Sequence, residues 1–300
     1  MPPPPFFHQT IKAPAKLNLS LKFIGRRSDG YHLLSMWNVL TTLHDELTIE
    51  IFEDKIPSVT VDVIGNPVLS ATPNIVEKAA FAWLQANNRS WRVHCRLQKN
   101  IPVGAGMGGG SSDAAAMLMA LERLGGSLHS GELSRIALSL GADVPYFLHG
   151  GAAWVGGIGE IIHPIEVGGL AGRPCIVVMP KVSLSTRLMY DAVRQKFPDL
   201  PESVERSPVL PPAGFSEMLP LLENDFEEIA MSVSPEVATV LTTLRSDRSL
   251  AAHMTGSGAA LFVLSREGDT PEHLETRVVG TLGRGTIVDK VTCFAVRLIV

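Results

Sequence analysis

The feature that most constrains this chain is a glycine-rich stretch, residues 101–113, which runs directly into a sequence typical of a helix. Five glycines fall within seven residues: Gly104, Gly106, Gly108, Gly109 and Gly110. Glycine adopts backbone conformations that other residues avoid, and it leaves no side chain in the way of a bound group. Because a helix N-terminus also offers unpaired N–H groups, the stretch is suited to hold a phosphate chain.

The residues among and after the glycines fit the same interpretation. The loop also contains Pro102, Val103, Ala105 and Met107. Ser111, Ser112 and Asp113 follow it and are residue types favoured at a helix N-cap. The two hydroxyls suit phosphate oxygens, and all three side chains suit the waters around a metal ion. The stretch is either a mobile glycine-rich connection before an ordinary capped helix or, as we expect, a phosphate-binding loop over residues 102–112.

Two familiar phosphate loops fit this stretch poorly. Gly104, Gly106 and Gly109 satisfy G-x-G-x-x-G, but a dinucleotide-binding fold needs a second strand that ends in an acidic residue about 20 residues later. That region, residues 127–140, has a helical pattern instead. A P-loop needs Lys followed by Ser or Thr after the last glycine, where this chain has Gly110 and Ser111. Neither loop type is predicted.

Composition narrows the class of protein. The chain has 300 residues, 45% of them hydrophobic and 19% charged, which is typical of one large or two ordinary globular domains. Its net charge of −4 argues against a nucleic-acid partner. The N-terminal MPPPPFF does not resemble a secretory signal, and no apolar run reaches the ~20 residues that span a bilayer. We therefore expect a cytoplasmic protein without a membrane partner.

Cysteines and histidines give no sign of a metal centre. The three cysteines are far apart, and the nine histidines show no metal-ligand spacing. We predict free thiols and assign no metal ligand to the protein.

A strand near the N-terminus carries the first candidate side chains. Residues 11–25 alternate between apolar and polar side chains, which predicts a half-buried strand. Lys16 and Asn18 are neighbours on its polar face. They either face solvent or offer an ammonium and an amide to a substrate.

Asp143 is the second chemical candidate. It is the only acidic residue in LGADVPYFLHG, so its ionised form would be costly unless it is paired or hydrogen-bonded. It either caps the short helix that follows or pairs with a lysine such as Lys16. The small-residue turn Thr255–Gly258 is either a hairpin or the wall of a phosphate-sized cleft.

The order of elements predicts an α+β protein. We expect helices at residues 74–87, 131–140, 186–195, 217–231, 235–244 and 271–283. After residue 174 the order suits helices on one face of an antiparallel sheet. We predict a domain boundary near residue 172, which gives domains 1–172 and 173–300.

Several segments together resemble the GHMP small-molecule kinases. They are PAKLNLSL, GRRSDGYH, IPVGAGMGGGSSDAA, LGADVPYFL, END and MTGSGAALF, in this order between residues 14 and 262. The resemblance implies a two-domain α+β fold with the active site in the cleft between the domains. It is strongest to the kinases that use ATP to phosphorylate the 2-hydroxyl group of a diphosphocytidyl polyol in isoprenoid precursor synthesis.

The resemblance also implies residue roles. Lys16 and Asp143 become the catalytic pair, and Asn18 contacts the substrate. Asn74 belongs to the adenine pocket, although a helix-capping asparagine explains it equally well. Mg²⁺ is expected because it accompanies ATP. We expect a monomer or weak homodimer.

The same resemblance implies a cytidine pocket. Tyr31 and His32 of GRRSDGYH form one part, and Tyr190 supplies a second aromatic ring. Arg187 and Tyr190 stand where some relatives have proline and phenylalanine, so this chain departs from the family pattern there. Two alternatives stay open: a kinase of another alcohol, such as homoserine or mevalonate, and a sugar or nucleotide sensor without activity.

Overall fold

The computed structural model describes residues 4–65, 69, 74–126, 128–129, 131–202, 207–266, 268–284 and 287–300. The chain forms two compact units. Unit 1 comprises Met1–Ala15, Leu43–Pro102 and Gly108–Gly150, and unit 2 comprises Lys16–Thr42, Val103–Met107 and Gly151–Val300. The sequence predicts one boundary, near residue 172, whereas the units interleave. The long strands β1 (Phe7–Arg26) and β2 (His32–Glu53) each contribute residues to both units. The domains 1–172 and 173–300 stay a prediction.

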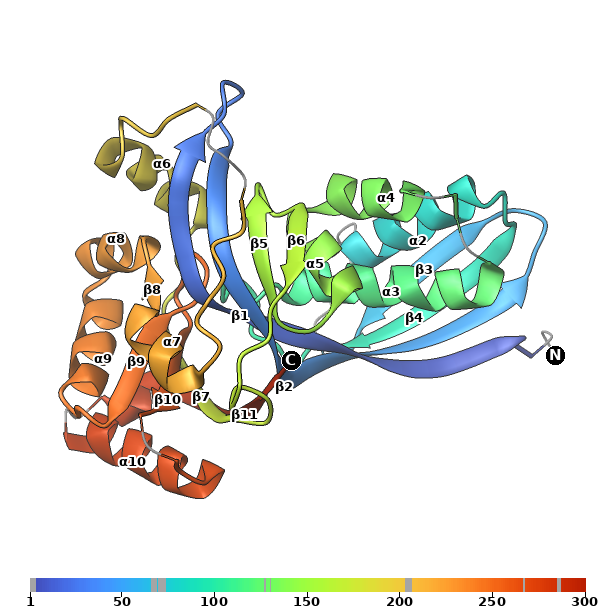
Figure 1. Cartoon of the computed structure of the whole chain (residues 1–300). Helices are drawn as coiled ribbons and strands as arrows, with labels where there is room; N and C mark the ends of the chain where they lie inside the picture. The colour runs from blue at the N-terminus through green and yellow to red at the C-terminus, as the bar shows by residue number, and fades with distance from the viewer. Residues whose placement is uncertain are drawn as a thin grey trace. The chain divides into compact units, whose positions relative to one another are not determined.

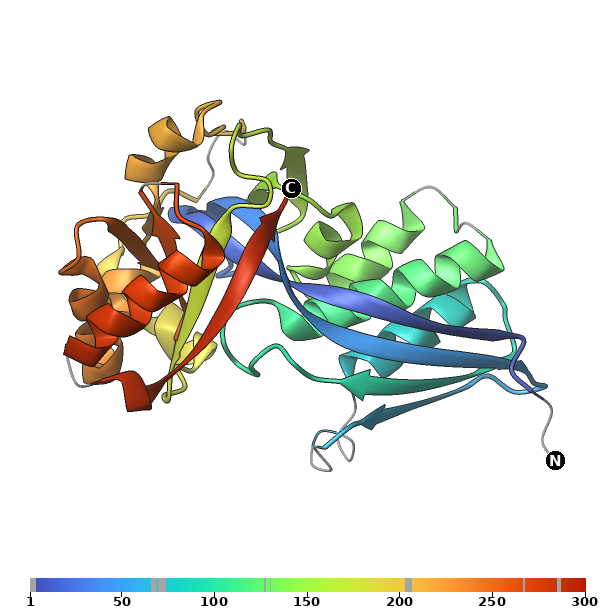
Figure 2. The same cartoon turned by 90° about the horizontal axis from the view of Figure 1, so that it is seen from below.

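Unit 1 is a sheet with helices on one face (Figure 2). Its other strands are β3 (Ser58–Val63) and β4 (Trp91–Gln98), and β4 pairs antiparallel with β2 and parallel with β3. The helices are α2 (Ile75–Ala86), α3 (Gly109–Gly125), α4 (Glu132–Leu140) and α5 (Val144–His149). Alternate residues of β4, such as Val93 and Leu97, are buried with Trp83 and Leu118 of the helices. These apolar faces form the core of the unit.

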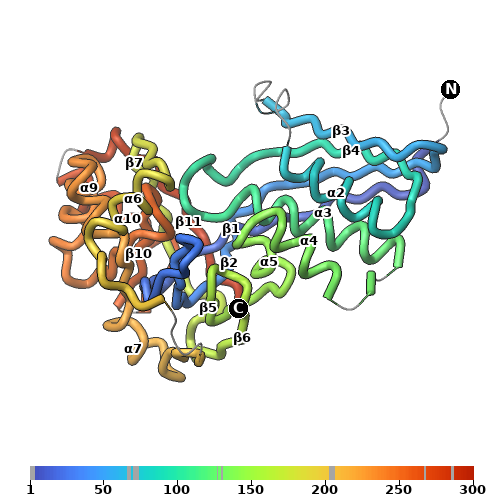
Figure 3. Tube along the Cα trace, turned by 90° about the horizontal axis from the view of Figure 1, so that it is seen from above, coloured from blue at the N-terminus to red at the C-terminus, as the bar shows by residue number. Residues whose placement is uncertain are grey.

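Unit 2 contains an antiparallel sheet in the order β9–β10–β7–β11, which β11 joins to the first part of β2. Its strands are β5 (Ala153–Gly157), β6 (Ile161–Pro164), β7 (Pro174–Pro180), β8 (Glu223–Asn224), β9 (Leu250–Met254), β10 (Leu261–Ser265) and β11 (Val291–Ile299). Its helices are α6 (Thr186–Lys196), α7 (Phe215–Met218), α8 (Phe226–Val233), α9 (Pro235–Arg245) and α10 (Pro271–Arg284), with short 3₁₀ turns η1 (Leu219–Leu221) and η2 (Val288–Lys290). Helices α9 and α10 pack on this sheet (Figures 1 and 3). The predicted α+β class is confirmed.

One predicted helix is wrong, whereas the other five begin and end within one residue of the expected positions. Residues 217–231 do not form a single helix. Pro220 lacks the N–H that would continue one, and β8 follows it and pairs in parallel with Ser20 and Leu21 of β1. This pairing joins segments that are about 200 residues apart in the chain, so no local pattern indicates it. None of the helices in the described ranges is long and apolar enough to cross a membrane.

Candidate active site

The tip of the glycine-rich loop, residues 103–107, packs backbone to backbone against the turn Thr255–Gly258 within unit 2. A Cβ at Gly106 would lie 2.9 Å from the carbonyl oxygen of Thr255, and one at Gly256 would lie 2.6 Å from the carbonyl oxygen of Gly106. Both distances are too short for any side chain. The contact therefore requires glycine on each side, and the turn is both a β9–β10 connection and the support of the loop tip.

Asn224 holds that turn from the other side. Its buried Nδ2 donates to the carbonyl oxygens of Met254 at 2.8 Å and Gly256 at 2.9 Å, while its Oδ1 accepts from the N–H of Phe226 at 2.9 Å. No role beyond the family resemblance was predicted for the END motif. The structure shows that its asparagine fixes the backbone at the start of the glycine turn.

Lys16 and Asn18 lie in β1 and are both buried, so the expected half-buried strand is wrong in this part. Lys16 is 4% exposed and Asn18 is fully buried. The Lys16 ammonium donates to Asn18 Oδ1 at 3.1 Å, which confirms that the two are neighbours on one face. The Asn18 N–H donates to Thr255 Oγ1 at 2.8 Å, and its side chain donates to Asn38 Oδ1 at 2.7 Å. Residues distant in sequence cover this face, which the alternating pattern does not reveal.

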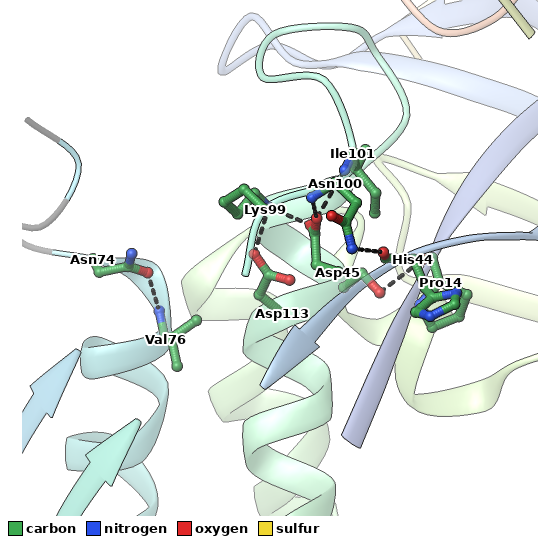
Figure 4. A network of polar contacts seen from close by, with 10 residues as sticks. Pro14, His44, Asp45, Asn74, Val76, Lys99, Asn100, Ile101 and Asp113 are labelled. Atoms are coloured by element: carbon green, nitrogen blue, oxygen red, sulfur yellow. Dashed lines mark hydrogen bonds and ion pairs between the residues drawn. The ribbon is translucent and has the colours of Figure 1, made fainter. Parts of the chain in front are cut away.

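The start of the loop is fixed in unit 1 by Asp45, which sequence reasoning missed. Figure 4 shows its carboxylate beneath residues 99–101. Asp45 Oδ1 accepts the N–H groups of Asn100 at 2.6 Å and Ile101 at 2.8 Å, and Oδ2 accepts from the Lys99 ammonium. Lys99 also donates to Asp113 Oδ2 at 2.7 Å. Asp45 is followed directly by Glu46 after the apolar-rich run in β2, so no local signal separates it from a surface carboxylate.

Two buried carboxylates therefore share one ammonium. Burial raises the pKa of Asp113 to about 7, an effect that the Lys99 charge opposes and the Asp45 charge increases. For Lys99, burial lowers the pKa, but the Asp113 charge and the hydrogen bonds to both carboxylates outweigh it, and its pKa is raised. Asp113 Oδ1 is buried and has no hydrogen-bond partner among the described residues. The cluster keeps its lysine charged.

Helix α3 begins earlier than the sequence predicts. Its N-cap is Gly108, with a φ of 72°, so Ser111, Ser112 and Asp113 lie inside the helix rather than at its cap. A positive φ is readily available to glycine, and it lets the chain turn into the helix without a capping side chain. The Ser112 hydroxyl donates instead to the carbonyl oxygen of Pro14 at 2.7 Å. The first N–H groups of α3 remain suited to an anion.

Asn74 and Asp143 both precede helices but behave differently. Asn74 is the N-cap of α2 and its Oδ1 accepts from the N–H of Val76 at 2.9 Å, so the capping interpretation is correct (Figure 4). Asp143 occupies the N-cap position of α5, yet its side chain makes no capping hydrogen bond. Asp143 belongs to unit 1 and Lys16 to unit 2, and their pairing stays a prediction.

The predicted cytidine-binding residues lie in unit 2. The buried ring of His32 is 5.4 Å from that of Tyr190, with the planes tilted by 34°. Burial lowers the pKa of His32, and Arg194 and Arg26 lower it further. Its Nε2 has no hydrogen-bond partner in the part of the chain that the structure describes. Tyr31 follows the β1–β2 turn and is 60% exposed. The structure thus brings His32 and Tyr190 together and leaves the Tyr31 ring at the surface.

Comparison with known proteins identifies the family. Two family signatures match the chain: the GHMP kinases N terminal domain at residues 74–151 and the GHMP kinases C terminal domain at residues 212–282. A 4-diphosphocytidyl-2-C-methyl-D-erythritol kinase of Polaromonas sp. strain JS666 is 41% identical over 263 residues, which cover 85% of this chain and 82% of the relative.

Solved structures agree with these matches. The crystal structure of a 4-(cytidine 5'-diphospho)-2C-methyl-D-erythritol kinase superposes with a TM-score of 0.73 and 31% identity, over 97% of this chain and all of the other. The mevalonate kinase of Methanococcus jannaschii has a TM-score of 0.66 at 14% identity, covers 98% of this chain and 99% of the other, and shows the fold alone. With the glycine-rich loop and its supporting turn in place, the chain belongs to the GHMP kinases and, among them, to the 4-diphosphocytidyl-2-C-methyl-D-erythritol kinase family.

Proposed function

We propose that this chain transfers the γ-phosphoryl group of ATP to the 2-hydroxyl group of 4-diphosphocytidyl-2-C-methyl-D-erythritol, a step in non-mevalonate isoprenoid precursor synthesis. The observation that carries this proposal is the 41% identity to a kinase of that name over 85% of the chain. The exposed glycines Gly104 and Gly110 of the loop support it, because a phosphate loop needs exposed backbone and no side chains.

In this proposal ATP lies along the loop. Residues 102–112 surround its phosphates, and the N-terminus of α3 faces negative charge. Mg²⁺ bound with ATP would supply positive charge beside the transferred group. No cluster of three or more His, Cys, Asp or Glu side chains within the described ranges is arranged to hold a metal ion. Asn74 uses its Oδ1 as a helix cap, so its Nδ2 is the group that would contact adenine.

The acceptor would bind through its cytosine ring and its polyol. Tyr190 and Tyr31 would stack on the base, and the unpartnered Nε2 of His32 would meet its polar edge. The lowered pKa keeps His32 neutral near pH 7, so Nε2 can accept or donate one hydrogen bond. Asn18 would contact the polyol.

Catalysis would be positioning with one proton transfer. The 2-hydroxyl oxygen bonds to the γ-phosphorus, the bond to the β-phosphate bridging oxygen breaks, and ADP leaves. Asp143 would accept the hydroxyl proton, and Lys16 would hold Asp143 ionised and orient the hydroxyl.

A coupled ADP-release assay tests the function. Mg-ATP is supplied with the diphosphocytidyl acceptor, and with homoserine, mevalonate and galactose as controls. Turnover with the diphosphocytidyl acceptor alone is expected. Turnover only with another alcohol would keep the family and refute the acceptor. Cell fractionation and size-exclusion chromatography test the expected cytoplasmic location and the monomer or weak homodimer.

A further inference from the structure

We propose that Asp45 is a positioning residue for ATP: it fixes both ends of the phosphate loop without touching the nucleotide. The inference rests on the proposed function, because it assumes that the loop binds ATP. Asp45 lies on β2, outside every motif that carries the family resemblance.

Asp45 lies on β2 just beyond the end of its pairing with β4. Glu46 and Gln98 are the last paired residues at this end of the β2–β4 ladder. Beyond them, the N–H groups of Asn100 and Ile101 turn to Asp45 Oδ1, at 2.6 and 2.8 Å. The side-chain Nδ2 of Asn100 also donates to the carbonyl oxygen of His44 at 3.0 Å. A side-chain carboxylate therefore replaces the strand partner at the point where the chain leaves the sheet to form the loop.

Asp45 is also connected to the far end of the loop, through Lys99. Lys99 bridges Asp45 to Asp113 of α3 (Figure 4). A Cβ at Gly109 would lie 3.1 Å from Ile101 Cγ2 and 3.3 Å from Lys99 Nζ, so the first residue of α3 touches the start of the loop. The two ends of the loop lie side by side, and the ion-pair bridge sets their separation.

Both oxygens of the Asp45 carboxylate already accept hydrogen bonds inside the protein. It is 0% exposed and accepts from two backbone N–H groups and one ammonium. A carboxylate in that state has no reason to bind a ligand, so any effect on ATP must pass through the backbone it holds. Truncating it leaves buried donors unpaired, which is the costly way to lose a hydrogen bond.

The test separates positioning from stability. Asp45→Asn keeps only one oxygen, so either the backbone donors or Lys99 face an NH₂ group instead of an acceptor, while Asp45→Ala keeps nothing. We expect KM for ATP to rise on the order of 10-fold for Asn and more for Ala, with KM for the cytidylyl acceptor within about 2-fold of wild type. Val61→Ala, in the buried face of β3, is the control that lowers the melting temperature of unit 1 without a bond to the loop.

The KM values of the variants for the two substrates decide the inference. A rise in KM for ATP alone, absent in Val61→Ala, supports it, and equal changes for both substrates or none would overturn it. If the Asp45 variants do not fold, Lys99→Met takes their place, because it removes the bridge but keeps both backbone bonds. It is judged by the same comparison of the KM for ATP with the KM for the acceptor.

Wild-type protein that binds ATP but does not phosphorylate the acceptor would refute the proposed function. Asp45 is then judged by the dissociation constant of ATP, from calorimetry, and wild type that does not bind ATP overturns both.

Discussion

Asp113 should make the protein less stable as the pH rises from about 6 to about 8. Its folded-state pKa is raised to about 7, from 3.8 for an ordinary aspartate, mainly because the carboxyl is buried. A carboxyl group with a raised folded-state pKa binds its proton more tightly in the folded state. The stability it contributes is therefore fully present below the unfolded pKa and is lost as the pH rises through 7.

The size of the effect follows from these two values. Relative to the ionised group, the proton contributes about 1 kcal/mol at pH 6 and almost nothing at pH 8, so the expected loss is on the order of 1 kcal/mol. Asp113 is 2% exposed, so solvent does little to screen the effect. Urea unfolding of wild type and Asp113→Asn at both pH values measures it, because Asn keeps an acceptor for Lys99 but does not titrate in this range.

Histidines titrate in the same interval, and the comparison removes their contribution. The pKa of His94 is raised, mainly by its hydrogen bond to Asp62, and adds to the loss, whereas burial lowers the pKa of His253 to about 4 and opposes it. Both are present in the variant, so the difference between the two slopes belongs to Asp113. Asp54→Asn, which removes an exposed carboxylate of the same unit, is the charge control. Identical slopes for wild type and Asp113→Asn would refute the reasoning and mean that Lys99 keeps Asp113 ionised.

Four further substitutions test the candidate site. Asn224→Ala should raise KM for ATP and lower the free energy of unfolding by about 1–3 kcal/mol, because the glycine turn loses two hydrogen bonds; unchanged ATP kinetics would contradict this. Gly106→Ala should weaken ATP binding by calorimetry, whereas Gly131→Ala, which has a similar positive φ but no atom within 4 Å, should not. Asp143→Asn should bind ATP but lose on the order of 10²- to 10⁴-fold in kcat, and near-normal turnover would remove it from the mechanism. Tyr31→Ala should raise KM for the cytidylyl acceptor but not for ATP, and equal losses would indicate a role in folding.

Local features of this fold could be predicted from the sequence because their causes are local. Helix α2 begins after Asn74, whose side chain accepts from the N–H two residues later. Helix α9 begins after Ser234, whose hydroxyl accepts from the N–H three residues later, with Pro235 in the first turn. The glycine-rich loop could be predicted from the sequence because several glycines within one short stretch have few other structural roles. The exact start of α3 could not, because Gly108 turns the chain with its backbone alone.

The contacts that organise the candidate site were beyond sequence reasoning because their partners are far apart in the chain. Asp45 lies 54 residues from Lys99, and Asn18 lies 237 residues from Thr255. A polar residue at such a position looks the same in the sequence whether it is solvated or enclosed. Lys16 shows the difference: the alternation of β1 places it on the polar face, and only the fold shows that this face is buried.

The loop itself is held by two sets of contacts that have no residue in common. Its ends belong to unit 1 and depend on the charged bridge from Asp45 through Lys99, whereas its tip belongs to unit 2 and depends on the uncharged turn that Asn224 supports. The buried bridge contains two carboxylates and one ammonium, so protonation of Asp113 changes its net charge from −1 to zero. Neither residues 103–107 at the tip nor the turn Thr255–Gly258 carries a titratable side chain. A change in pH should therefore act on the loop through its ends and not through its tip.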